Sequence, residues 1–228
     1  MHLLALETSS EFCSVALATA EDCLSREAAA GQNHSSLLLP MIDALLAEAG
    51  IARGQLTGIA FGAGPGSFTG VRIACAVAQG MGLGLGLPLF PVATLEAMAE
   101  LSGHNRVIAA LDARLDEIYA AVYQRGGEGW ECLLAPCLTS LEALPLPEGG
   151  GWAGLGSAFA MRDGALSRRL SAHLSWSTAA VHPEAEGVAR LGRTMAKRGA
   201  GVDAADAHPL YLRDKVALTV AERSAQGR

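Results

Sequence analysis

Lysine is nearly absent from this chain, since Lys197 and Lys215 are the only two among its 228 residues. Aromatic residues make up 5% of the sequence and charged residues 18%, whereas half of the residues are hydrophobic. Because no lysine follows the glycine-rich segments, a Walker A phosphate loop is excluded. The high hydrophobic content excludes a disordered chain and favours a compact globular fold with closely packed backbones.

Cysteine and histidine lack the spacings of metal sites and disulfide frameworks. The five cysteines are scattered and never form Cys-x-x-Cys, as expected of small buried side chains in a reducing cytosol. No two of the six histidines are spaced i, i+3 or i, i+4, and no Gly-x-Ser-x-Gly elbow occurs. This spacing predicts no metal-binding cluster, and the expectation of no metal ion, no cofactor and no catalytic residue comes from the family resemblance given below.

Basic residues are scarce in the first half. Residues 1–105 contain nine acidic and three basic residues, whereas residues 106–228 contain fourteen of each. Binding a nucleic-acid backbone needs clustered cations, so the first half is not suited to it alone. The acidic surface is either simply solvated or complementary to a basic partner.

No leader or membrane span is expected. Met1 runs directly into an apolar strand without the basic start of a signal peptide. The longest apolar stretch, residues 73–93, is interrupted by glycines, Pro88 and Pro91, which favours a buried helix over a span. We expect a cytoplasmic protein.

Hydrophobic periodicity predicts an α/β fold. Two strands joined by a polar turn open the chain, a third follows, and a helix runs from Ser35 or Ser36, as its cap, to Ala49. A strand over residues 57–64, a helix over 69–87, a strand over 88–93 and a helix over 94–101 follow. Helices are also predicted near 158–170 and 183–198, residues 126–156 are expected to be irregular, and 208–217 should be the last ordered piece.

The second half repeats the design of the first. Leu6-Glu7-x-x-x-Glu11 recurs as Leu111-Asp112-x-x-x-Asp116, each at the end of an apolar strand. We therefore divide the chain into an N-terminal lobe, residues 1–105, and a second lobe, residues 106–228. The C-terminal segment could pack back on the first lobe.

Two turns are candidates for phosphate binding. Short hydroxyl side chains at the first hairpin turn can surround a phosphate, and the acid there could hold a hydrated metal ion. The second turn is glycine-rich and runs into a helix, whose N-terminus favours anions. An ordinary Ser-rich turn and a tight helix-docking turn are the structural alternatives. The candidates are Glu7, Thr8, Ser9, Ser10, Gly64, Gly66 and Ser67.

Two helices are more apolar and richer in glycine than a surface helix needs. In the second, Gly70, Ala74, Ala78, Gly82 and Gly86 recur every four residues, with Ala76, Gly80 and Gly84 beside them. Each interior glycine costs about 1 kcal/mol relative to alanine, which close helix–helix approach would offset. Internal packing explains this as well as a partner does. The candidate partner interface comprises Leu37, Leu38, Met41, Ile42, Leu45, Ala74, Ala78, Met81, Gly82 and Leu85.

For two further groups of polar residues, a structural role is favoured over a chemical one. His34 could bind a metal, but it stands alone. Asp112, Arg114, Asp116 and Glu117 could serve acid–base chemistry, but a salt-bridged turn is favoured.

Several segments together resemble the bacterial TsaB (YeaZ) family. They are LALETSSEFCSVAL, HSSLLLPMIDALL, GAGPGSFTGVRIACAVAQGM, LDARLDEIYAAVY and PLYLRDKVA, in this order along nearly the whole chain. The resemblance implies a duplicated actin-like fold (ASKHA, ribonuclease H-like) with two lobes of mixed sheet and helices. It also implies a role in making threonylcarbamoyladenosine at position 37 of transfer RNAs that read codons beginning with A.

In that system, the resemblance implies, a TsaD-like subunit carries the metal and transfers the threonylcarbamoyl group, and a TsaE-like ATPase joins it. The TsaB-like subunit is the non-catalytic dimerisation scaffold, and it pairs through the two helices described above. The catalytic relative has His-x-x-x-His, whereas this chain has His34 followed by Leu38. The rival interpretations are an active ATP-dependent kinase or hydrolase, a metallopeptidase-like protein, and a stand-alone homodimer.

Overall fold

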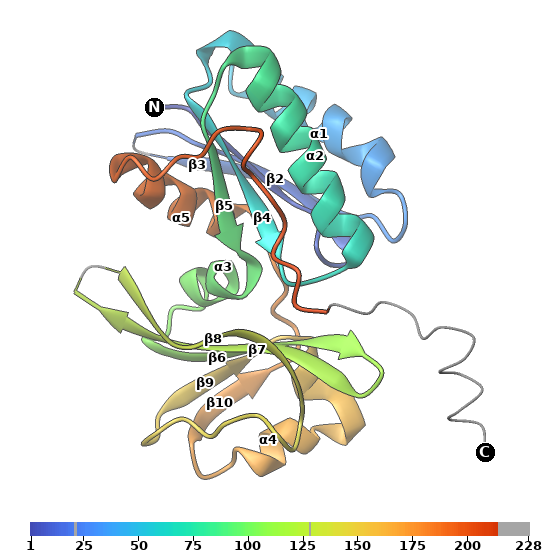
Figure 1. The fold of residues 1–228 in the computed structure, drawn as a ribbon, viewed down its shortest axis with the longest axis vertical. Coiled ribbons are helices and arrows are strands. Elements are labelled where there is room, and N and C mark those ends of the chain that lie inside the picture. Colours follow the sequence, from blue (N-terminus) through green and yellow to red (C-terminus); the bar gives the residue numbers. More distant parts are fainter. Residues whose placement is uncertain (21, 128, 214–228) are drawn as a thin grey trace.

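The computed structural model describes residues 1–20, 22–127 and 129–213, which form two lobes of the same topology (Figure 1). The first sheet has the strand order β3-β2-β1-β4-β5 and the second β8-β7-β6-β9-β10. In each sheet two antiparallel pairs are followed by two parallel pairs. This duplication is the predicted actin-like fold. The strands are β1 Leu3–Glu7, β2 Phe12–Ala18, β3 Cys23–Ala29, β4 Gly58–Gly64, β5 Leu89–Ala93, β6 Arg106–Arg114, β7 Glu117–Gly126, β8 Gly129–Ser140, β9 Trp152–Leu155 and β10 Leu174–Thr178.

Both faces of the first sheet are covered. Helices α1 (His34–Glu48) and α2 (Phe68–Leu85) pack on one face, towards which Cys13, Val15 and Leu17 of β2 point. Since alternate residues of a strand point to opposite sides, Ala16 and Ala18 face the other helical layer.

The ends of α2 follow the local sequence. The Ser67 side chain accepts a hydrogen bond from the Gly70 N–H, and Gly86 ends the helix with a left-handed φ of 64°. Helix α1 differs from the prediction, because it begins at His34 and has no side-chain cap from Ser35 or Ser36. In the described ranges, α2 is the one helix that is long and apolar enough to cross a membrane. Of its 18 residues, 33% are buried inside the protein.

The lobes exchange their last helices. Helix α3 (Thr94–Leu101) follows the first sheet, but its Leu95 and Met98 pack against β6 and β7 of the second. Helix α5 (Ala185–Lys197) follows the second sheet, but its Val188 packs against the first. The helix that covers this face of the first sheet therefore comes from beyond residue 105, the boundary that the sequence suggested.

The remaining helices cover the other face of the second sheet. The 3-10 helix η2 (Ser157–Asp163) and helix α4 (Ala165–Arg169) contribute Phe159 and Leu166 to that core. A short 3-10 turn, η1 (Arg53–Gln55), precedes β4. The prediction of an irregular region over 126–156 is wrong, because β8 and β9 lie within it and the glycines and prolines gather in the connection between them.

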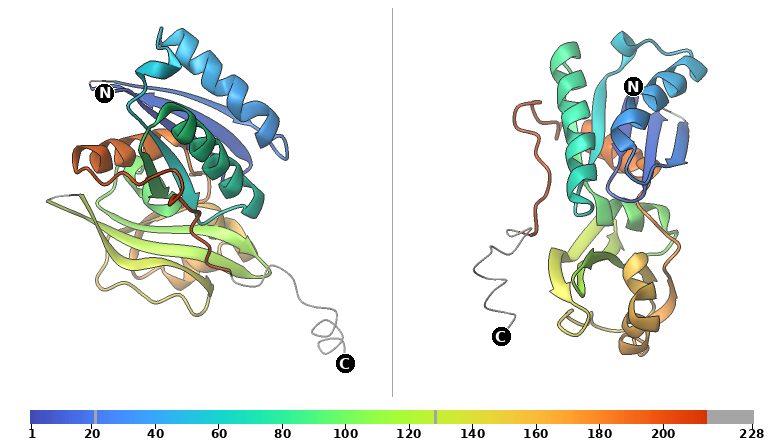
Figure 2. Two further views of the ribbon diagram at one scale, coloured as in Figure 1. Left: turned by 45° about the horizontal axis from the view of Figure 1, so that its top comes forward. Right: turned by 90° about the vertical axis from the view of Figure 1, so that its right-hand side faces the viewer.

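After α5 the chain returns to the first lobe. We call residues 200–213 the return segment, which runs beside α2 and then crosses to the second lobe (Figure 2). Leu89 and Val202 exchange two backbone hydrogen bonds of 2.9 Å, and the Leu210 N–H donates to the Ala63 carbonyl at 2.7 Å. The last part of the predicted ordered piece, residues 214–217, lies outside the described residues.

We predict that the helix exchange depends on Gly187 at the crossing of α3 and α5. A Cβ at Gly187 would overlap the Ala97 carbonyl oxygen, so Gly187→Ala should lower the free energy of unfolding by about 1–3 kcal/mol. A Cβ at Gly80 of α2 would meet nothing within 4 Å, so Gly80→Ala should raise it by up to about 1 kcal/mol. Urea unfolding followed by circular dichroism measures both, and equal effects of the two changes would contradict the prediction.

Candidate functional site

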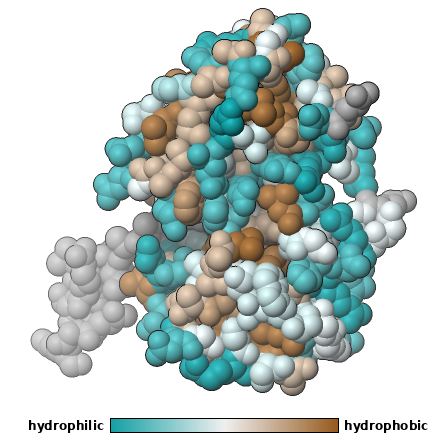
Figure 3. Space-filling view, turned by 180° about the vertical axis from the view of Figure 1, so that it is seen from behind, coloured by the Kyte–Doolittle hydropathy of each residue, from teal (hydrophilic) through white to brown (hydrophobic). Residues whose placement is uncertain are grey.

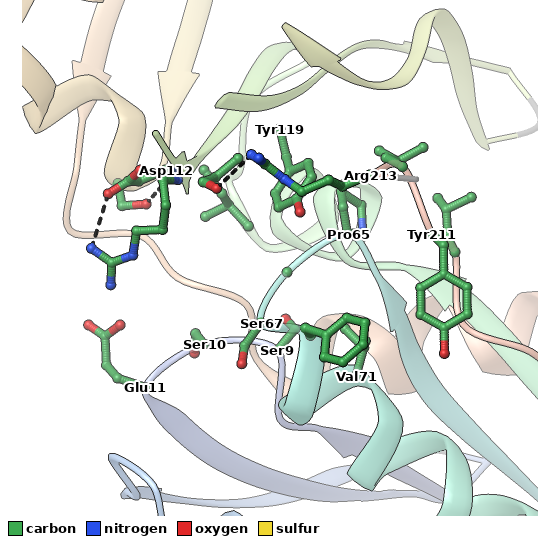
Figure 4. A pocket seen from close by; sticks show the side chains of 18 of the residues that line it. Ser9, Ser10, Glu11, Pro65, Ser67, Val71, Asp112, Tyr119, Tyr211 and Arg213 are labelled. Atoms are coloured by element: carbon green, nitrogen blue, oxygen red, sulfur yellow. Dashed lines mark hydrogen bonds and ion pairs between the residues drawn. The ribbon is translucent and has the colours of Figure 1, made fainter. Parts of the chain in front are cut away.

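A cavity of about 710 Å³ lies between the lobes (Figure 4). The first lobe supplies the β1–β2 turn and the start of α2, and the second lobe supplies the β6–β7 hairpin around Asp112. The return segment closes one side with Leu210, Tyr211, Leu212 and Arg213. These last residues were not among the predicted site residues, because nothing in their local sequence indicates that they return to this point.

The two predicted phosphate-binding turns meet here, but they bind each other. The Ser67 N–H donates to the Ser9 carbonyl at 2.7 Å, and Thr8 Oγ1 donates to the Gly70 carbonyl at 2.7 Å. A Cβ at Gly66 would lie 2.5 Å from the Ser9 Cβ, and one at Gly70 would overlap the Thr8 carbonyl. The glycines are therefore accounted for by the close packing of one turn on the other.

Only part of the predicted set reaches the cavity. Ser9, Ser10, Gly66 and Ser67 line it. Glu7, Thr8 and Gly64 lie behind this wall and are absent from the lining. The arrangement is a hydroxyl-rich wall with backbone already engaged in hydrogen bonds.

Glu7 is a buried acid rather than a metal ligand. Its side chain is 1% exposed, its Oε1 accepts the Ser9 N–H at 2.6 Å, and its Oε2 accepts the Thr94 hydroxyl at 3.4 Å. Gly62 faces it, and a Cβ there would overlap Oε2. A hydrated metal ion does not fit here, so that interpretation is wrong. Burial raises the pKa of Glu7, and together with the Glu7 charge it raises the pKa of Cys13 to about 11.

His34 is also occupied. Its Nε2 donates to the carbonyls of Ser10 and Phe12 at 2.9 and 3.2 Å, and the residue is 6% exposed. Leu38, one turn further, is fully buried in the core beneath α1. Within the described ranges, no three His, Cys, Asp or Glu side chains gather to bind a metal.

The charged residues of the β6–β7 hairpin form separate ion pairs. Asp112 pairs with Arg114, Asp116 with Arg162 at 3.1 Å, and Glu117 with Arg213 at 2.7 Å. The prediction of a salt-bridged turn is confirmed, because each carboxylate has its own arginine.

Six of the ten predicted interface residues face inwards. Leu38, Ile42, Leu45, Ala74, Ala78 and Gly82 are buried in or beside the core of the first lobe, so none of these six is exposed on the free chain. Helical spacing alone does not tell which stripe of an all-apolar helix faces the sheet. Leu37, Met41 and Met81 are partly buried, and Leu85 is exposed; for these four the interface stays a prediction.

A different stripe of α2 faces outwards. We call Thr69, Arg72, Ala76, Gly80, Leu83 and Gly84 the outer face of α2, and all six are exposed. Leu83 is 80% exposed, and a Cβ at Gly80 or Gly84 would meet no atom within 4 Å. Internal packing therefore explains Gly70 and Gly82, but not Gly80 and Gly84.

Comparison with known proteins gives the family. A family model described as "TsaD: tRNA N6-adenosine threonylcarbamoyltransferase" matches residues 27–154. The chain is 34% identical to the tRNA threonylcarbamoyladenosine biosynthesis protein TsaB of Escherichia coli K12, over 95% of this chain and 96% of that protein. The chain belongs to the TsaB family. The chain is 43% identical to the TsaB protein of Haemophilus influenzae, over 52% of this chain and 52% of that protein.

Solved structures place this TsaB-family chain in the same fold. YeaZ from Pseudomonas aeruginosa matches with a TM-score of 0.84 and 37% identity, covering 92% of this chain and 99% of that one. A second structure, described as an uncharacterized protein with similarity to peptidase YEAZ from the same organism, matches with a TM-score of 0.86. The predicted family and its actin-like fold are thus confirmed.

We predict that Glu7 makes stability depend on pH. Because its pKa is raised from 4.5 in the folded chain, the native state holds a proton that the unfolded state releases above that pH. Stability should therefore fall as pH rises, by about 1.4 kcal/mol for each unit by which the pKa is raised. Between pH 5 and 8 the native chain should lose more stability than Glu7→Gln, in which other titrating groups are unchanged. Parallel urea-unfolding curves at both pH values would refute this.

Proposed function

We propose that this chain is the non-catalytic scaffold subunit of a complex that makes threonylcarbamoyladenosine at position 37 of transfer RNAs reading codons beginning with A. It pairs with a TsaD-like threonylcarbamoyltransferase subunit, a TsaE-like ATPase joins the pair, and the isolated chain pairs with itself. The transfer RNA is the substrate of the complex, which works in the cytoplasm.

The outer face of α2 carries this proposal. An interior glycine costs a helix about 1 kcal/mol relative to alanine, and no contact among the described residues offsets that cost at Gly80 and Gly84. Small residues at Ala76 and Gly80 let a second helix approach closely, and Leu83 can insert beside it. The side of the molecule turned away in Figure 1 instead carries hydrophobic residues in separate patches between hydrophilic ones (Figure 3).

The occupied polar groups support the non-catalytic part. His34 Nε2 is hydrogen-bonded to two backbone carbonyls, and Leu38 cannot bind a metal. Glu7 is buried beneath the turn that would have to receive a ligand. The names of the relatives connect the family to biosynthesis of threonylcarbamoyladenosine.

We predict that Gly80→Leu weakens pairing without harming the fold. Leucine has open space in the free chain and a better helix propensity, so the free energy of unfolding should rise by roughly 0.5–1 kcal/mol. At a close helix crossing it should cost about 1–3 kcal/mol of pairing energy, roughly tenfold to a hundredfold in Kd. Light scattering and titration against the purified TsaD-like subunit measure the two kinds of pairing.

Thr194→Leu is the matched control, because it places the same side chain on the exposed face of α5, on the other side of the first sheet. It should leave both kinds of pairing unchanged. If Gly80→Leu pairs as tightly as Thr194→Leu, the proposed face is wrong.

The cavity between the lobes favours a second candidate, an ATP-dependent enzyme of the actin-like class, since its volume of about 710 Å³ suits a drug-sized ligand. Against it, the two turns that would receive phosphate are hydrogen-bonded to each other. We expect calorimetric titration with Mg-ATP to show no micromolar binding and no hydrolysis by the isolated chain. Binding with turnover would defeat the scaffold proposal.

A further inference from the structure

Arg72 is exceptional among the cations of the first half. Residues 1–105 contain three basic residues, and two of them form ion pairs, Arg26 with Glu48 and Arg53 with Asp43. Within the described part of the chain, no carboxylate lies within ion-pair distance of Arg72, and the nearest acidic residues in sequence are Glu48 and Glu96. Among the described residues, this exposed arginine of an acidic lobe thus has no acidic partner.

Two aromatic rings hold this arginine in place. The guanidinium carbon lies 3.2 Å from the centroid of the Phe68 ring and 5.0 Å from that of Tyr211. Nε donates to the Tyr211 hydroxyl at 2.9 Å, which uses one of the five N–H donors. Stacking and this bond restrict the side chain before any partner arrives, which lowers the entropy lost on binding.

The return segment fixes the Tyr211 side of this arrangement. On one side of Tyr211 the Leu210 N–H bonds to the Ala63 carbonyl of β4, at 2.7 Å. On the other, Arg213 pairs with Glu117 at 2.7 Å and donates to the Ala113 carbonyl at 3.0 Å. Tyr211 therefore does not depend on Arg72 for its place.

The Arg72 guanidinium lies against Phe68 and Tyr211, at the N-terminal end of the outer face of α2. Phe68 and Tyr211 line the cavity, whereas Arg72 is absent from its lining. Its spacing of four and eight residues from Ala76 and Gly80 puts it on the stripe that carries the small residues.

We propose that Arg72 is a preorganised anchor for a carboxylate, Asp or Glu, on the subunit that pairs with the outer face of α2. This rests on the proposed function. A planar guanidinium with its remaining donors free binds a carboxylate in a two-pronged manner, which a lysine cannot reproduce. The location on the helix-packing stripe selects a protein side chain over a phosphate group in the cavity.

The test measures pairing of four variants with the purified TsaD-like subunit by titration and by dissociation rate. Arg72→Gln should raise Kd on the order of thirtyfold, mainly through faster dissociation. Arg72→Lys should raise it roughly tenfold, because the charge stays and the fork is lost. Tyr211→Phe should raise it about threefold, since the ring stays and one hydrogen bond goes. Arg53→Gln, which breaks an exposed ion pair elsewhere on the lobe, should stay within about twofold.

Thermal unfolding of each free variant verifies that the fold is kept. Equal Kd values for Arg72→Gln and Arg53→Gln, or an Arg72→Lys variant that pairs like the native chain, would overturn the anchor. Binding of inorganic phosphate or transfer RNA by the isolated chain that is lost in Arg72→Gln, with pairing unchanged, would overturn it in favour of a phosphate ligand. If Gly80→Leu weakens pairing and Arg72→Gln does not, only the Arg72 anchor is refuted. If neither change weakens pairing, the proposed outer face of α2 is refuted as well.

Discussion

The crossing of α3 and α5 is the contact on which the rest of the structure depends. Each of these helices belongs by sequence to one lobe and packs against the sheet of the other. Gly187 lets the two helices approach until a Cβ would overlap the Ala97 carbonyl. Because each lobe buries apolar surface that the other supplies, the lobes cannot separate without exposing both cores.

This exchange also determines which helical surface stays free. Helix α5 occupies one face of the first sheet, α1 and α2 occupy the other, and the return segment lies along one flank of α2. What remains of α2 is its outer face, where small residues lie in the middle and Arg72 and Leu83 lie towards the ends. The polar turns at the cavity are meanwhile consumed by contacts with each other. The outer face of α2 is thus exposed, whereas the polar turns at the cavity are hydrogen-bonded to each other.

Much of this was predictable from the sequence. The helix predicted over residues 69–87 corresponds to α2, and the repeated Leu6-Glu7 and Leu111-Asp112 pattern indicated the duplication. The glycine pattern of α2 was more ambiguous, because Gly82 and Gly80 differ only in what surrounds them: Leu89 presses on the first and nothing on the second. The return of Tyr211 to Arg72 joins residues 139 positions apart, and no local pattern encodes such a contact.

The origin of α5 has a consequence for how the chain is made. A ribosome releases β1 to β5 first, yet the helix that covers one face of their sheet ends at Lys197. Until most of the chain has been synthesised, Leu3, Ala5 and Phe90 lack their cover on that side. Domains generally fold as units during synthesis, but this first lobe is complete only when the second has been made. Until α5 has been synthesised, the nascent first lobe therefore exposes one apolar face of its sheet.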